Sequence, residues 1–269
     1  MTEWPNIHMS KSKFTMLDSL SLQDFDENSE LIPLMTSEDE EAIKNESLPD
    51  SVPILSLRNT VLFPGVVIPI NAGRDKSIKL INDANKSNKL IGVVAQKNTK
   101  IENPSVENIY GVGTVAKILR VLKMPDGNTT VIIQGKKRFK IKSVVKTDPY
   151  IQATIDSVSD KSQKESDSKF SATIDAIKDI SLKIIKENPN IPSEASFAIK
   201  NIHSSAFLIN FVCSNMNITV KEKQELLSSI SIDKRALKCL KLLNVEYEKL
   251  ALKNDIQSKV RNDLDQQQR

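Results

Sequence analysis

The residues that most often carry enzyme chemistry occur in this sequence without the spacing that such chemistry requires. The two histidines, His8 and His203, stand alone, and a lone histidine on an apolar helix is far more often a packing residue than a metal ligand. The two cysteines, Cys213 and Cys239, belong to no CxxC motif and have no histidine partner in the sequence. This cysteine usage fits a protein of a reducing compartment.

Phosphate-binding and nucleophilic motifs are also missing from the sequence. None of the seven glycines belongs to a GxxxxGK[ST] phosphate loop, and Gly111 and Gly113 are not followed by the third glycine of a dinucleotide-binding turn. Serines and lysines are abundant, but no short spacing distinguishes a nucleophilic pair from a solvated surface. We therefore predict no catalytic residue, no cofactor-binding residue and no metal site in these 269 residues.

One basic run, residues 135–142, could contact nucleic-acid phosphates. Its cations alternate with apolar residues, as they do in a strand with one buried face. No aromatic residue is interleaved on the basic face to stack on bases. The pattern therefore favours a half-buried strand with a solvated face. On this interpretation Ile133, Phe139 and Ile141 point inward, and Lys136, Arg138, Lys140 and Lys142 face water.

A β-rich region between residues 51 and 159 would position this strand. Short apolar runs alternate with turn signals, one of which predicts a hairpin at residues 124–128. Residues 73–89 predict a single helix with Lys79 and Asp83 spaced for an ion pair. Many short strands without regular βα alternation indicate an antiparallel, barrel-like domain. The predicted strands cover residues 54–58, 66–70, 90–96, 113–123, 129–142 and 150–158.

Helical periodicity replaces the strand pattern in residues 169–269, after a polar linker at residues 160–168. A first helix ends at Asn188-Pro189, and a second opens at Pro192 and carries the apolar residues from Phe197 to Val212. Thr219 and Glu222 form a capping box for a third helix. Asp233 can cap a fourth, roughly 50 Å long. That helix meets no stop signal, so we expect the chain to be a fragment of a longer protein.

Residues 1–50 are acidic, with few and unpatterned apolar residues, and predict a disordered leader. The first residues lack the apolar core of a signal peptide, and prolines and charges break every apolar run before it could span a membrane. The formal charge is only +4, so no global field calls for nucleic acid or a membrane. We expect a cytoplasmic protein.

Several short segments, which begin in the apolar run after Val52, carry a family resemblance. They are residues 53–61 (PILSLRNTV), 63–65 (FPG), 68–70 (IPI), 73–78 (GRDKSI), 94–97 (VAQK), 112–116 (VGTVA), 123–127 (KMPDG), 256–260 (IQSKV) and 267–269 (QQR). These segments closely resemble the N-terminal domain of Lon, the ATP-dependent bacterial protease, and the resemblance is almost continuous between residues 52 and 269.

The resemblance implies a six-stranded, PUA-like β pseudobarrel with one helix, followed by an all-α bundle that ends in a long helix. It also implies that the parent chain continues into an ATPase module, which uses ATP and Mg, and a protease module with a Ser–Lys dyad. The catalytic positions of both modules have no counterpart here, so no catalytic residue is carried over. The implied role is recognition of unfolded or damaged proteins and assembly of a homohexamer, with no membrane or nucleic-acid partner.

The sequence leaves two questions open. A free-standing adaptor with a Lon-like domain, or a PUA-like RNA-binding protein, is the alternative to a protease recruitment region. The second question concerns the turn after the first strand. Leu62, Phe63 and Val66 form a patch for unfolded polypeptide if they are exposed, whereas Phe63 plugs the end of the barrel if it folds inward.

Overall fold

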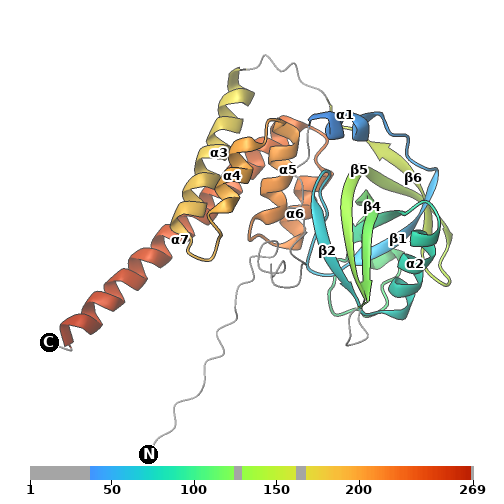
Figure 1. Cartoon of the computed structure of the whole chain (residues 1–269), viewed down its shortest axis with the longest axis horizontal. Helices are drawn as coiled ribbons and strands as arrows, with labels where there is room; N and C mark the ends of the chain where they lie inside the picture. The colour runs from blue at the N-terminus through green and yellow to red at the C-terminus, as the bar shows by residue number, and fades with distance from the viewer. Residues whose placement is uncertain (1–36, 124–128, 162–167, 268–269) are drawn as a thin grey trace, which may run out of the picture.

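A computed structural model describes residues 37–123, 129–161 and 168–267. The strands gather into one β domain, helices α3 to α7 form a bundle beside it, and the end of α7 projects away from both (Figure 1). The predicted α+β class, with a six-stranded barrel-like sheet followed by helices, is confirmed. Within the described ranges no helix is long and apolar enough to cross a membrane.

The strands close into a ring. Their order is β2-β5-β4-β3-β1-β6, and an additional β5–β6 pairing joins the far end of the sheet back to β5. Strand β2 pairs with the first part of β5, outside that ring. All six strands lie where the sequence predicts them: β1 (Ser51–Leu57), β2 (Val67–Ala72), β3 (Leu90–Ala95), β4 (Val112–Lys123), β5 (Thr129–Lys146) and β6 (Gln152–Val158). The predicted hairpin turn at 124–128 is outside the described residues.

One strand pair departs from the antiparallel arrangement that the sequence predicts. Strands β1 and β3 run parallel, with Ile54 opposite Gly92 and Leu57 opposite Ala95. Parallel neighbours need a crossover connection, which here consists of β2 and helix α2 (Asp75–Lys86). The other pairings between the described strands are antiparallel.

Two apolar clusters form the core. One fills the interior of the ring with residues from β1, β3, β4, β5 and β6, among them Phe139, whose predicted inward position is confirmed. The other cluster is continuous from the β domain into the helical bundle. It includes Leu80 and Ile81 of α2 as well as Leu208 of the bundle. The bundle is therefore packed on the β domain as well as tethered to it.

Two helices lie near the start of the described chain, one where the sequence predicts a helix and the other within the predicted disordered leader. Helix α2 lies within the predicted range, and Lys79 Nζ is 3.4 Å from an Asp83 carboxylate oxygen, as its spacing indicates. Helix α1 (Ser37–Asn45) was not expected, because residues 1–50 read as disordered. It buries Ile43 and is followed by Glu46, whose carbonyl oxygen accepts a hydrogen bond from Lys137 Nζ. A tertiary contact with β5 thus orders a segment that its composition assigns to disorder.

The bundle contains one more helix than the sequence predicts. The predicted second helix is two helices, because Ile202 is extended and the Ser204 side chain accepts a hydrogen bond from the Phe207 N–H at 3.2 Å. The Thr219–Glu222 capping box is confirmed. The last helix is capped by Ser231, whose Oγ accepts from the Lys234 N–H, and not by the predicted Asp233. The helices are α3 (Ser168–Glu187), α4 (Glu194–Asn201), α5 (Ser205–Asn215), α6 (Val220–Ser228) and α7 (Ile232–Gln267).

Candidate functional site

The loop between β1 and β2, which the sequence offers as an exposed apolar patch, is buried. Leu62 and Val66 are each 2% exposed and Phe63 is fully buried. The exposed arrangement is therefore not the one observed. Phe63 packs in the cluster shared with the bundle and not in the one that fills the ring, and a role of these residues in substrate binding stays a prediction. All three side chains belong to the cluster that continues into the helical bundle, and Asn210 of α5 donates its Nδ2 to the carbonyl oxygen of Pro64 at 3.2 Å.

The backbone of this loop fits closely against β5. Pro64 and Gly65 form a turn that the Val66 N–H closes onto the Phe63 oxygen at 3.3 Å, and Gly65 has a φ of 80°, which favours glycine. The Gly65 N–H donates to the Gly135 carbonyl oxygen, and the Gly135 N–H donates to the Val66 carbonyl oxygen, each at 2.9 Å. A Cβ at Gly135 would lie 2.3 Å from the Phe63 oxygen, so the loop needs a glycine at that point of β5.

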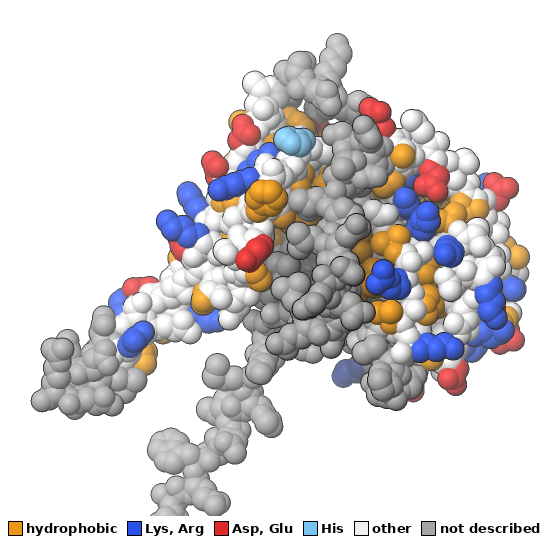
Figure 2. Space-filling view, in the orientation of Figure 1, with side chains coloured by type: hydrophobic (Ala, Val, Ile, Leu, Met, Phe, Trp, Pro, Cys, Tyr) orange, Lys and Arg blue, Asp and Glu red, His pale blue; other side chains and the backbone are white. Residues whose placement is uncertain are grey.

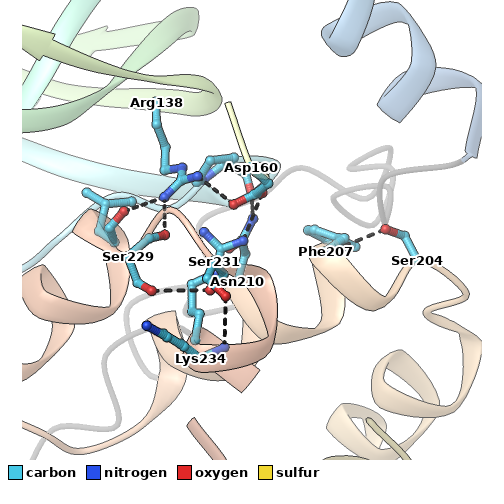
Figure 3. A network of polar contacts seen from close by, with 11 residues as sticks. Arg138, Asp160, Ser204, Phe207, Asn210, Ser229, Ser231 and Lys234 are labelled. Atoms are coloured by element: carbon cyan, nitrogen blue, oxygen red, sulfur yellow. Dashed lines mark hydrogen bonds and ion pairs between the residues drawn. The ribbon is translucent and has the colours of Figure 1, made fainter. Parts of the chain in front are cut away.

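An ion-pair network joins the β domain to the bundle. Arg138 of β5 donates to Asp160 at 2.5 Å and to the carbonyl oxygen of Ser229 at 2.7 Å (Figure 3). It also donates to the carbonyl oxygen of Leu227 at 2.7 Å, and Arg235 of α7 donates to the other Asp160 oxygen at 2.9 Å. Both guanidinium groups are almost fully buried. Burial, reinforced by the nearby Arg235, lowers the pKa of Arg138 to about 10. We call Arg138, Asp160 and Arg235 the interdomain clasp.

The clasp corrects one prediction. Arg138 was placed on the solvated face of its strand, but the bundle covers that position, which no pattern within β5 could show. Asp160, the first residue of the predicted polar linker, holds two arginines, and Lys161 beside it pairs with Ser231. Residues 162–167 are outside the described residues. The division of the chain into two separately folding units stays a prediction.

Two lysines of the basic run lie close to carboxylates. Lys136 lies 3.9 Å from the Glu46 carboxylate, and Lys142 lies 3.6 Å from that of Asp156. This arrangement agrees with the interpretation of residues 135–142 as a structural strand.

The bundle core brings together the two cysteines that the sequence leaves far apart. Cys213 of α5 and Cys239 of α7 are both free thiols and both fully buried. A hydrogen bond with Cys213, together with burial, raises the pKa of the Cys239 thiol. A thiol held in its protonated form is a poor nucleophile. Among the described residues, no group of histidine, cysteine, aspartate and glutamate could hold a metal ion.

An open cleft of about 660 Å³, which we call the β1 cleft, lies in the β domain. Its walls are strand β1, the start of helix α2, the loop at residues 103–107 with the short 3-10 helix η1 (Val106–Asn108), and the loop at residues 147–151. Helix α2 lies on the side of the β domain away from the bundle (Figure 1). The volume is within the range of sites that hold small molecules and short peptide segments.

The β1 cleft has both charged and apolar walls. Arg74, at the start of α2, donates Nη1 to Ser56 Oγ at 3.1 Å and Nη2 to Gln96 Oε1 at 3.0 Å. Burial lowers the pKa of Arg74, with Arg58 as a further cause. Tyr150 donates its hydroxyl to Asp83 at 3.1 Å, and burial raises its pKa. The remaining charged lining residues are Lys76, Glu107 and Asp148, and the apolar ones include Leu80, Val106 and Ile151.

Sequence reasoning missed this cleft. Its walls come from four segments that are separated by other elements, and none of them contains a recognisable motif. The available signals were weak: Ser56 is a polar residue within an apolar strand, and Arg74 directly precedes a helix.

Figure 2 shows a different feature, hydrophobic side chains that reach the surface over β2, β4 and β5. Among the strand residues, Leu119 and Leu122 of β4 and Val144 and Val145 of β5 are exposed. Leu252, Ile256 and Val260 are exposed along α7.

Comparisons with known proteins place most of the chain in one family. A family profile described as the ATP-dependent protease La (LON) substrate-binding domain matches residues 51–245. The Lon protease of Flavobacterium johnsoniae is 65% identical over 97% of this chain, and that of Cytophaga hutchinsonii is 46% identical over 89%. These matches cover 32% and 30% of the relatives, so the chain spans about a third of their length.

Solved structures show the same fold. The N-terminal domain of a Mycobacterium avium complex Lon protease has a TM-score of 0.58 at 20% identity and covers 72% of this chain and 98% of its own. The Lon N-terminal domain protein from Xanthomonas campestris has a TM-score of 0.52 at 15% identity, covering 71% of this chain and 96% of its own. At these identities the likeness concerns the fold alone.

Proposed function

This chain belongs to the family of Lon substrate-binding domains, and from that premise we propose that it captures polypeptide substrates for an ATP-dependent protease. The observation that carries the proposal is the family match over residues 51–245. It favours a recruitment region over a free-standing adaptor or an RNA-binding protein. The burial of Arg138 within the basic run also speaks against phosphate binding there.

We further propose that the chemistry of the protease belongs to other parts of the parent protein. ATP and Mg would bind an ATPase module, and peptide cleavage would need a Ser–Lys pair that the sequence of this chain does not indicate. Assembly into a homohexamer and a cytoplasmic location are proposals that rest on the resemblance to Lon. The substrates would be unfolded or damaged proteins.

Capture needs residues that a substrate can reach. Leu62, Phe63 and Val66 would be accessible only if the bundle moved away from the β domain, so we assign capture to the open surface of the β domain.

Binding to a permanently unfolded protein tests the proposed function. Reduced and carboxymethylated α-lactalbumin, labelled with a fluorophore, would be titrated with the chain and followed by fluorescence anisotropy. We expect saturable binding, and much weaker binding of the native, disulfide-bonded form as the matched control. Equal binding of both forms, or of neither, would contradict substrate capture by this chain.

A further inference from the structure

The outer edge of strand β1 is only partly paired. Residues 51–53 pair with β6, and the Ile54 N–H donates to the Ile151 oxygen at 2.8 Å, after which β6 and the loop before it diverge from β1. Strand β1 nevertheless continues to Leu57, paired on its other side with β3. Within the described chain no other strand pairs with the outer edge beyond Ile54.

The direction of the backbone groups follows from the observed hydrogen bonds. The Ile54 N–H points toward β6, whereas the Leu57 oxygen points toward β3 and accepts from the Gln96 N–H at 2.9 Å. Because these directions alternate along a strand, the N–H and C=O of Ser56 point outward, as those of Ile54 do. Residues Ile54 to Ser56 line the β1 cleft, so this edge faces open space. A sheet edge of this kind is a template for an added strand.

The surroundings of this edge suit a peptide in extended form. Arg74 uses two guanidinium N–H groups on Ser56 and Gln96, and a guanidinium has five such donors in total. Its remaining donors can reach a peptide carbonyl. Lys76 and Glu107 provide both signs of charge at the rim, and Leu80 and Ile151 provide apolar wall. Main-chain hydrogen bonds depend little on sequence, which is what a receptor for varied unfolded chains requires.

We propose that the β1 cleft binds an extended segment of substrate polypeptide, which adds as a strand along the outer edge of β1 at Ser56. This inference rests on the proposed function and specifies how the substrate is held. The segment would donate and accept main-chain hydrogen bonds with Ser56, and its side chains would contact α2 on one side and the 147–151 loop on the other.

Three variants test the mode of binding, with the carboxymethylated α-lactalbumin titration as readout. Ser56→Pro removes the outward N–H, and proline is tolerated where a strand edge faces away from its partners. Ser77→Trp fills the cleft from α2 without altering β1. We expect each to weaken binding about tenfold or more, the effect of losing a main-chain hydrogen bond or the space for the ligand. Lys86→Trp, at an exposed position at the end of α2 outside the cleft lining, is the matched control for Ser77→Trp, and we expect binding within about twofold of wild type.

Hydrogen exchange on the unmodified chain provides a test that does not depend on the folding of any variant. Exchange of the Ser56 amide, followed by NMR, should slow about tenfold or more when the carboxymethylated protein saturates the chain, whereas amides of β2 should not change. Wild-type binding with an unprotected Ser56 amide and an unaffected Ser77→Trp variant would overturn the inference and leave the proposed function intact. Absence of binding by wild type would overturn the proposed function and the inference with it.

Discussion

The C-terminal end of strand β1 borders two regions of opposite character. Beyond Leu57 the chain enters the loop that holds Phe63, where side chains are buried and backbone groups are paired with β5 and Thr114. Along its outer edge at Ser56, the same strand faces an open cleft. The more apolar region is the closed one. Apolar sequence near a strand end therefore indicates core here, and the region available to a ligand is the more polar one.

This contrast predicts that substitutions in the loop will change stability, whereas substitutions in the cleft will change binding.

Replacing the buried ring at the loop should have the largest effect. We expect Phe63→Ala to lower the free energy of unfolding by about 3–5 kcal/mol, because it removes a fully buried aromatic ring and leaves a cavity. Urea denaturation followed by circular dichroism measures the change. Phe197→Ala, at a phenylalanine that is 69% exposed, is the control and should change stability by less than about 0.5 kcal/mol. Similar values for the two variants would contradict the buried loop.

Removal of the central carboxylate of the interdomain clasp should rank second. Asp160→Ala leaves two buried guanidinium groups facing each other, and we expect a loss of about 3 kcal/mol, the lower end for a broken buried ion pair, because a third of the Asp160 side chain is exposed. Asp156→Ala breaks an exposed pair with Lys142 and should cost about 0–1 kcal/mol. If the two losses were equal, the clasp would contribute no more than a surface pair.

A single buried hydroxyl should have an intermediate effect. Thr114 donates its Oγ1 to the Leu62 oxygen at 2.6 Å, so Thr114→Val would leave that carbonyl without this donor and should cost about 1–3 kcal/mol. Thr130→Val removes an exposed hydroxyl bonded to Asn71 and serves as control, with a change within about 0.5 kcal/mol. Thermal unfolding of both variants at one pH gives the comparison. An unchanged Thr114→Val protein would show that the loop does not depend on this bond.

Charge removal at the rim of the β1 cleft should have the smallest effect on stability. Lys76 and Asp148 form an exposed pair at 3.7 Å, and Glu107 lies in the opposite wall. We expect Lys76→Gln and Glu107→Gln each to change the free energy of unfolding by less than about 0.5 kcal/mol. A loss above about 2 kcal/mol in urea denaturation would show that the rim is part of the folded framework, and the division between closed loop and open cleft would fail.

The sequence by itself determined the local elements of this protein. Alternation of apolar residues located all six strands, and Thr219 with Glu222 located a helix start. These signals succeed because strand periodicity and helix capping depend on residues a few positions apart. The break at Ser204 carried a local signal of the same kind, which the apolar run around it concealed.

Tertiary structure alone decided which faces are covered. Arg138 is buried because it meets Leu227, 89 residues away, and the Pro64 turn is closed off by Asn210, 146 residues away. The β1 cleft also depends on contacts between distant segments. It forms where β1, still paired with β3, is no longer paired with β6. The alternation of apolar and polar residues shows that a strand has two different faces. Whether water or another element covers each face depends on contacts between distant segments, which no local pattern contains.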